Sequence, residues 1–168
     1  ITKNGGTGKS IISESIQYYK KYLEKDGRKK RSFESEFLFS DIDYDTKFVN
    51  IQDAYKDFPL EQLYNMITGT LEVEPKFKDV IYIPFEYSPK FAVNTNFLDI
   101  KFKDFSDERR RQIIEIGNFW KIGSELHGET PSCKEQLGKK LFGKNFTEQD
   151  WNEFYNFGIH CIQVYLNE

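Results

Sequence analysis

A glycine-rich turn followed directly by an amphipathic segment limits what this chain can fold into more than any other feature of its sequence. Glycines in such a turn let backbone N–H groups point at phosphate oxygens, and the N-terminus of a following helix adds partial positive charge. The turn therefore predicts a phosphate-binding loop, in which a lysine reaches the β- and γ-phosphates of a nucleotide and a serine ligates Mg²⁺. The residues are Gly5, Gly6, Thr7, Gly8, Lys9 and Ser10, with Lys9 and Ser10 in those two roles.

The loop departs from the full phosphate-binding pattern at one position, because Lys3 stands where a glycine is usual. A glycine-rich turn ahead of an ordinary helix is the alternative. The position of Gly8, Lys9 and Ser10 at the expected helix start favours phosphate binding. Because the chain opens inside this motif, we expect a longer parent protein with a central strand ahead of the loop, and a fragment less stable than that parent.

Size and composition are those of one folded domain. The chain has 168 residues, and aromatic side chains make up 17% of them, which is enough to fill a core. Lys and Arg number 24 against 27 Asp and Glu, and the resulting net charge of −3 excludes a uniformly basic nucleic-acid coat protein. No apolar run approaches the roughly 18 residues that a membrane span needs, so we expect no membrane partner.

The cysteines and histidines are not spaced as a metal site. Cys133 and Cys161 lack a CxxC pair, and we interpret them, with His127 and His160, as ordinary side chains rather than zinc ligands. A disulfide scaffold is excluded, and the cysteine usage fits a reducing cytoplasm.

Hydrophobic spacing predicts helices alternating with strands. The first helix should carry its apolar face as far as Leu23 and end at Asp26-Gly27. Strands are predicted at 37–39, 48–51 and 90–94, a short helix at 60–67 and another helix at 109–120.

A last helix is predicted from a capping box of Thr147 and Asp150, with Phe146 packing on Trp151. We expect it to bury the face formed by Trp151, Tyr155, Ile159, Ile162 and Leu166.

A β-hairpin with a basic tip is predicted where the apolar period switches to two. Apolar residues alternate with polar ones over 71–73 and return over 81–85, and residues 75–79 join the two runs. Lys76 and Lys78 lie in the joining segment. Taken alone, this segment also fits an ordinary solvated turn.

Hydrolysis of ATP would also require an acid at the end of a strand beside the loop, where it holds the metal's water shell or orients the attacking water. One candidate strand ends in Asp41, with Asp43 nearby, and the other ends in Asp53. We favour Asp53 as the catalytic and metal-binding acid, because a short helix and the hairpin follow it.

The order of these parts resembles that of superfamily 3 helicases, a group within the AAA+ ATPases. A phosphate-binding loop, a strand with a terminal acid, a short helix, a basic hairpin, a strand ending in asparagine and an arginine cluster follow one another. The likeness is greatest to the helicase part of primase-helicases of phages, mobile elements and large DNA viruses, and runs from Lys3 to about Leu166. The family's strand ends in two acids, whereas this chain has Gln52-Asp53.

The resemblance implies a role in DNA binding for the hairpin, because residues 63–69 and the hairpin resemble the family's DNA-tracking element. Lys76 and Lys78 are then the DNA-binding residues. In a hexameric ring, six copies of each would form a basic collar suited to backbone phosphates, and Phe77 could pack on sugar or base.

The resemblance also implies roles at the nucleotide for residues later in the chain. Residues 88–96 resemble the polar sensor strand, which would place Asn96 at the γ-phosphate. Residues 106–110 resemble the segment that supplies an arginine finger to the neighbouring subunit, with Arg110 as the finger and Arg109 as a secondary candidate. An arginine supplied in this way can be worth about 10³–10⁵ in rate.

The implied fold is α/β, a P-loop NTPase of the AAA+ type with a parallel sheet flanked by helices and a hairpin inserted at 70–85. The expected ATPase core covers 1–122, and a helical segment over 123–168 packs on it. The implied activity is that of an ATP-dependent DNA helicase motor with ATP and Mg²⁺ as cofactors. Single-stranded DNA, a homo-hexameric ring and an upstream primase domain are its expected partners, in the cytoplasm of a bacterium or a phage-infected host.

Two alternatives stay open. A small-molecule P-loop kinase would need an acceptor pocket and a mobile lid, and no separate lid segment is evident in the sequence. A non-hydrolysing ATP-binding module that only assembles on DNA is suggested by Gln52, which replaces the first acid of the family's pair.

Overall fold

The structure is a computed structural model that describes residues 7–30, 33, 35, 37–97, 105–117 and 137–167. It divides into two compact units, Ile1–Asn118 and Phe119–Glu168. Of the predicted features, Gly5, Gly6, His127 and Cys133 lie outside the described residues.

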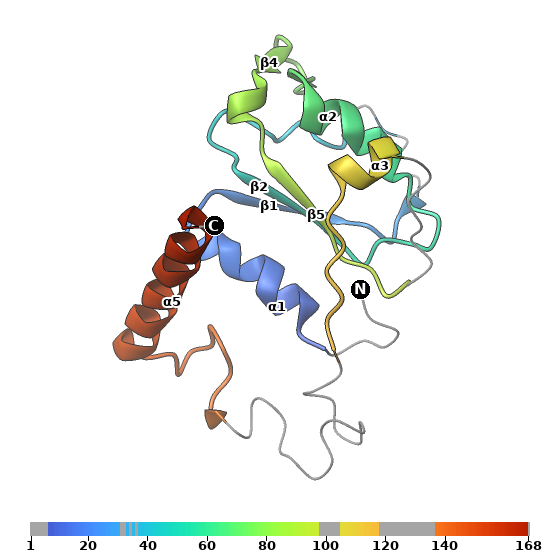
Figure 1. The fold of residues 1–168 in the computed structure, drawn as a ribbon. Helices are drawn as coiled ribbons and strands as arrows, with labels where there is room; N and C mark the ends of the chain where they lie inside the picture. Colours follow the sequence, from blue (N-terminus) through green and yellow to red (C-terminus); the bar gives the residue numbers. More distant parts are fainter. Residues whose placement is uncertain are drawn as a thin grey trace. The chain divides into compact units, whose positions relative to one another are not determined.

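A three-stranded parallel sheet organises the first unit (Figure 1). The strands β1 (Tyr22–Asp26), β2 (Phe48–Gln52) and β5 (Lys90–Val93) lie in the order β1-β2-β5. Phe48 pairs with Tyr22 on one side and with Lys90 on the other, so β2 is the middle strand. The prediction of an α/β fold with a parallel sheet and flanking helices is confirmed at this level.

The two faces of β2 differ in chemistry, because successive side chains of a strand point to opposite faces. Val49 and Ile51 are fully buried in the hydrophobic core, which also contains Ile83 of the hairpin. Asn50, also fully buried, and Gln52 occupy the alternate positions. Their side-chain hydrogen bonds involve α1 and the end of β5, so α1 (Lys9–Glu14) covers the polar face of the sheet.

The first predicted helix is too long. Helix α1 ends at Glu14, a 3₁₀ helix, η1, spans Ser15–Tyr18, and β1 then begins at Tyr22. Leu23 continues the helical spacing of the earlier apolar residues, but it packs against the core from β1. The reason is tertiary, since all five β1 residues pair with β2 and this pairing outweighs the local helical pattern.

Gly27 ends β1 for a steric reason. Its N–H donates to the carbonyl oxygen of Gln52 at 2.6 Å, and a Cβ atom at Gly27 would come within 2.6 Å of that same oxygen. The close approach of the backbones at the ends of β1 and β2 therefore requires glycine here.

Two other predicted elements are wrong. Residues 37–39 form a turn rather than a strand, with the Ser40 N–H donating to the Phe37 carbonyl, and the side chains of Leu38 and Phe39 pack on the core without strand pairing. Helix α3 spans only Phe105–Arg110, and residues 111–117 are not helical. Three isoleucines fall in that stretch, and branching at Cβ lowers helix propensity. The remaining residues of that predicted helix, 118–120, lie outside the described part.

The middle of the chain forms as predicted. The short helix is a 3₁₀ turn, η3 (Leu60–Leu63), that continues into α2 (Tyr64–Thr68). The hairpin pairs β3 (Leu71–Val73) with β4 (Ile81–Ile83) in antiparallel fashion, with Leu71 opposite Ile83. A 3₁₀ turn, η4 (Phe85–Tyr87), follows, so Phe85 lies beyond β4.

The second unit contains the long helix α5 (Glu148–Leu166). The predicted capping box is confirmed, because the Thr147 side chain accepts from the Asp150 N–H and the Asp150 carboxylate accepts from the Thr147 N–H. The Phe146 and Trp151 rings pack edge to face, 4.9 Å apart, as predicted. The predicted buried face is wrong, since no described α5 residue is buried, and ring contacts reach only the first turns of the helix.

Candidate functional site

The described part of the glycine-rich loop leads into α1 through a left-handed residue. Gly8 has a φ of 93° and is the N-cap of α1, and its carbonyl accepts a hydrogen bond from the Ile12 N–H. A Cβ at Gly8 would meet no atom within 4 Å, so the backbone conformation rather than crowding favours glycine here. Thr7 beside it is buried.

Lys9 and Asn96, two of the predicted site residues, meet although 87 positions separate them. The Lys9 ammonium donates to Asn96 Oδ1 at 2.5 Å. Only 8% of Lys9 is exposed, which is unusual for a lysine. Asn96 follows β5, so the parallel sheet carries the asparagine to the edge at which α1 begins.

A cluster of buried and half-buried polar side chains extends inward from this pair. The amide nitrogen of Asn94 donates to Ser13 Oγ at 2.7 Å, to Gln52 Oε1 at 2.8 Å and to Asn50 Oδ1 at 3.2 Å. The cluster thus connects α1, β2 and the end of β5 through side chains alone. Sequence reasoning did not assign Asn50 a role, although a polar residue inside an apolar strand was a usable signal.

Ser10, the predicted metal ligand, meets Gln52. The Ser10 hydroxyl donates to Gln52 Oε1 at 3.4 Å, and the amide nitrogen of Gln52 donates to Glu14 Oε1 at 3.2 Å. Ser10 and Glu14 are four residues apart on α1, which places them on one face of the helix. Glu14 was not predicted, and only that spacing marks it in the sequence.

Asp53, the predicted acid, lies one residue beyond the end of β2. It is exposed and has a left-handed φ of 50°. Within the described ranges, no hydrogen bond or ion pair joins it to Lys9 or Ser10. Its charge acts on Arg28. The pKa of Arg28 is raised mainly by a hydrogen bond from its guanidinium to Asp26, and the charge of Asp53 raises it further to a smaller extent.

Tyr22 is hydrogen-bonded to the polar cluster through Asn50. Its hydroxyl accepts from the Asn50 amide at 2.8 Å and donates to Glu24 at 3.1 Å. Burial is the main cause that raises the pKa of Tyr22 well above its ordinary value, and the charges of Glu24 and Glu14 act in the same direction. The phenol therefore stays protonated at neutral pH.

Two arginines, at the end of α3 and just beyond it, lie over the ring of Tyr64 of α2. The Arg110 guanidinium lies over the Tyr64 ring, 5.3 Å from its centre, and donates to the Ser106 carbonyl at 3.0 Å. Arg111 pairs with the buried Asp107, which also accepts from the Tyr64 hydroxyl. Burial and this hydrogen bond raise the pKa of Tyr64 to about 12.

Arg109, the secondary candidate, is placed differently from its neighbour. It is exposed, and its guanidinium lies 5.2 Å from the centre of the Phe105 ring. Of the two predicted arginines, Arg110 is the one whose guanidinium lies over a ring of α2.

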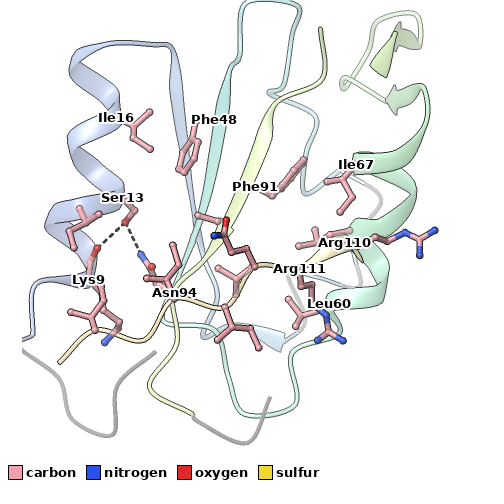
Figure 2. Close-up of a pocket in the computed structure, with 18 of the residues that line it drawn as sticks. Lys9, Ser13, Ile16, Phe48, Leu60, Ile67, Phe91, Asn94, Arg110 and Arg111 are labelled. Carbon is pink, nitrogen blue, oxygen red and sulfur yellow. Dashed lines mark hydrogen bonds between the residues drawn. The ribbon is translucent and has the colours of Figure 1, made fainter. Parts of the chain in front are cut away.

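A pocket of about 640 Å³ has Lys9 of the loop and the arginines Arg110 and Arg111 in its walls (Figure 2). Lys9 and Asn94 line it on the α1 side, and Arg110 lies on the α2 side. Apolar side chains, including Phe48 and Phe91, lie between them. Lys9 and Arg110 of one chain therefore border the same cavity, and in the described structure no hydrogen bond joins them.

The predicted DNA-binding lysines lie apart from this site, at the hairpin tip. Lys76 and Lys78 are exposed, and the Lys76 ammonium lies 5.6 Å from the centre of the Phe37 ring. Phe77 between them is fully exposed and has a φ of 60°. A phenylalanine held open to solvent in the left-handed region is uncommon.

The described part of the chain holds neither a conventional metal cluster nor a membrane-spanning helix. There, no group of three or more His, Cys, Asp or Glu side chains could hold a metal ion, and Cys161 is an exposed free thiol. None of the described helices combines the length and apolar character needed to cross a bilayer.

Comparison with known proteins gives a family without an activity. The family model described as "Family of unknown function (DUF5906)" matches residues 1–111, which is more than half of the chain. No curated protein matches the chain.

Proposed function

The chain belongs to the family of unknown function DUF5906, and we propose that its loop site binds ATP with Mg²⁺ and hydrolyses it to drive a DNA helicase. The hydrogen bond of 2.5 Å between Lys9 and Asn96 is the observation that carries this proposal. A lysine beside a glycine-rich loop neutralises phosphate, and a polar side chain beside it can orient the γ-phosphate or the attacking water.

The side chains beside the loop have donor chemistry that fits a magnesium nucleotide. Ser10 offers a hydroxyl oxygen and Gln52 an amide oxygen, and both are hard oxygen ligands of the kind that Mg²⁺ accepts. When bound, the metal would neutralise charge on the phosphates. Asp53 as a metal ligand and catalytic acid stays a prediction.

The motor part of the proposal rests on the resemblance to superfamily 3 helicases, and a P-loop NTPase fold of the AAA+ type is proposed with it. In a hexameric ring, ATP lies between subunits, with Lys9 and Ser10 on one side and Arg110 of the next subunit on the other. The exposed Lys76 and Lys78 of each hairpin then contact single-stranded DNA in the channel. Hydrolysis shifts neighbouring subunits and moves the hairpins along the strand.

A non-hydrolysing ATP-binding module is the second candidate, and one observation favours it. The side chain that reaches the Ser10 hydroxyl is the neutral Gln52, and Asp53 is exposed beyond the strand. A neutral amide cannot act as a base toward water, so ATP would be held without turnover if no other acid acts at the site.

Hydrolysis measured with and without single-stranded DNA tests the proposal and separates the two candidates. Wild-type protein should hydrolyse ATP faster with DNA, Lys9→Ala should abolish turnover, and Lys20→Ala, which removes an exposed lysine between η1 and β1, should retain it. Binding of ATP without turnover would select the non-hydrolysing module. Turnover that persists in Lys9→Ala would show that the site is wrongly assigned.

A mixing experiment tests the shared site. Lys9→Ala and Arg110→Ala subunits each lack one half of the proposed site, so mixed rings should contain some complete sites and regain partial turnover. No recovery at any mixing ratio would contradict a site built from two subunits.

A further inference from the structure

We infer that Glu14 is a positioning residue whose carboxylate holds the Gln52 amide with its oxygen toward Ser10 and the metal of the proposed ATP site. This inference rests on the proposed function, and it names a residue that no motif in the loop includes. It also gives a role to Gln52, which stands where an acid is expected.

The orientation of the Gln52 amide follows from its three neighbours. An ionised carboxylate can only accept hydrogen bonds, so Glu14 requires the nitrogen end of the amide, which donates to it at 3.2 Å. On the other side, the Asn94 amide nitrogen can only donate, so it requires the oxygen end, which accepts at 2.8 Å. The Ser10 hydroxyl lies 3.4 Å from that same oxygen.

The placement of Glu14 comes from α1 and β2 together. Four residues separate it from Ser10, so both side chains project from one face of α1 toward β2. Gln52 is the last residue of β2 and lies half-buried between them. Glu14 therefore reaches the loop through Gln52 rather than directly.

The chemical consequence is a neutral oxygen where a carboxylate would be usual. An amide presents either a donor or an acceptor, and its –NH₂ group would repel a cation beside Ser10. Replacing Glu14 removes the hydrogen bond that fixes the amide nitrogen, so the Gln52 amide can then adopt both orientations. Partners that orient a metal's ligands are typically worth about 10–100-fold in metal affinity when they are mutated.

The test measures how much Mg²⁺ strengthens binding of ATPγS, a slowly hydrolysed ATP analogue, in a fluorescence titration with and without the metal. Glu14→Gln should lower this enhancement about tenfold and leave metal-free binding unchanged, which also shows that the variant is folded. Glu86→Gln, an exposed acid in η4, serves as the matched control and should behave as wild type.

Two variants of Gln52 decide whether Glu14 acts through this amide. Gln52→Ala should lower the enhancement by itself, and Glu14→Gln should then have no further effect. Gln52→Glu presents oxygens in both orientations but adds a negative charge against Glu14. In that background Glu14→Gln should strengthen the effect of Mg²⁺, which reverses the sign seen with Gln52 present.

Each outcome supports or overturns the inference. Normal Mg²⁺ enhancement in Glu14→Gln, or independent and additive losses from Glu14→Gln and Gln52→Ala, would overturn it while nucleotide binding persists. If wild-type protein binds no ATPγS with or without Mg²⁺, the proposed function itself fails and the inference falls with it.

Discussion

The loop end of the parallel sheet and the tip of the β3–β4 hairpin both carry lysines, but the structure holds those lysines in opposite ways. Lys9 is almost fully buried and donates to Asn96, within a cluster that joins α1, β2 and β5. Lys76 and Lys78 are exposed on either side of an exposed Phe77. One region is organised by specific side-chain contacts, and the other presents charge and an aromatic ring to solvent.

This difference indicates what each region can recognise. A buried lysine with a fixed partner suits one ligand in one orientation, because its position depends on the surrounding hydrogen bonds. Exposed lysines on a turn suit a polyanion whose phosphates can be met in several ways, and their contribution is sensitive to salt. Helix α2 connects the two regions. It is followed closely by β3 of the hairpin, and the Arg110 guanidinium lies over the ring of its Tyr64.

Replacing Arg110 should have the largest effect and tests which region this arginine serves. Arg110→Ala should lower ATP hydrolysis by about 10³-fold or more while ATP affinity changes little, because an arginine from the next subunit meets charge that develops only in the transition state. Single-turnover hydrolysis and equilibrium ATP binding are the measurements, with Arg109→Ala as the neighbouring comparison. A parallel loss of ATP affinity would place Arg110 at its own chain's nucleotide.

The buried base of the hairpin should contribute to the free energy of unfolding far more than the exposed part near its tip. Ile83→Ala removes a fully buried side chain from the core, so the free energy of unfolding should fall by about 2–5 kcal/mol. Val80→Ala, at an exposed position just before β4, should cost less than about 1 kcal/mol. Urea denaturation measures both, and equal costs would mean that the hairpin base is not part of the core.

The positive charge at the hairpin tip should affect the binding of DNA and leave the binding of nucleotide unchanged. Lys76→Ala combined with Lys78→Ala should weaken binding of single-stranded DNA and flatten the slope of log affinity against log salt by about 1.4 if each lysine contacts one phosphate. ATP binding should be unchanged. Lys29→Ala with Lys30→Ala, two exposed lysines after β1, is the control for general charge. An unchanged salt slope in the tip variant would contradict the DNA-binding role.

The smallest effect is expected at Phe77 and concerns stability. Phe77→Asn places a residue that tolerates a positive φ at an exposed turn, so the free energy of unfolding should change by no more than about 0.5 kcal/mol. DNA affinity should fall, because stacking of a base on an aromatic ring is lost. A large loss of stability would show that Phe77 packs against the protein.

Local patterns in the sequence were enough to predict β2, the hairpin, β5 and the start of α5. Each of these has a short-range signal, namely a short apolar run in β2 and β5, alternation in the hairpin and the Thr147–Asp150 capping box. β1 was hidden because Leu23 lies at helical spacing from Ile16, and only pairing with β2 reveals the strand. Both ends of α3 were missed, since the helix was predicted over 109–120 and α3 spans Phe105–Arg110.

The candidate site was predicted in part, through the order of motifs. From that order we predicted that Lys9 and Asn96 both lie at the γ-phosphate. In the structure the two side chains are hydrogen-bonded. The sequence could not decide which of two adjacent side chains at the end of β2 faces α1. The pleat of the strand directs Gln52 to Ser10, and Asp53 follows with a left-handed backbone. Glu14 has no motif, so only packing of α1 on the sheet reveals it.

Equilibrium binding of ATPγS to the wild type, Lys9→Ala and Lys20→Ala proteins tests the central claim most directly. If the buried Lys9 beside Asn96 holds a triphosphate, Lys9→Ala should weaken binding roughly 100-fold or more, and Lys20→Ala should bind as the wild type does. Equal affinity of all three proteins for the nucleotide would contradict the account.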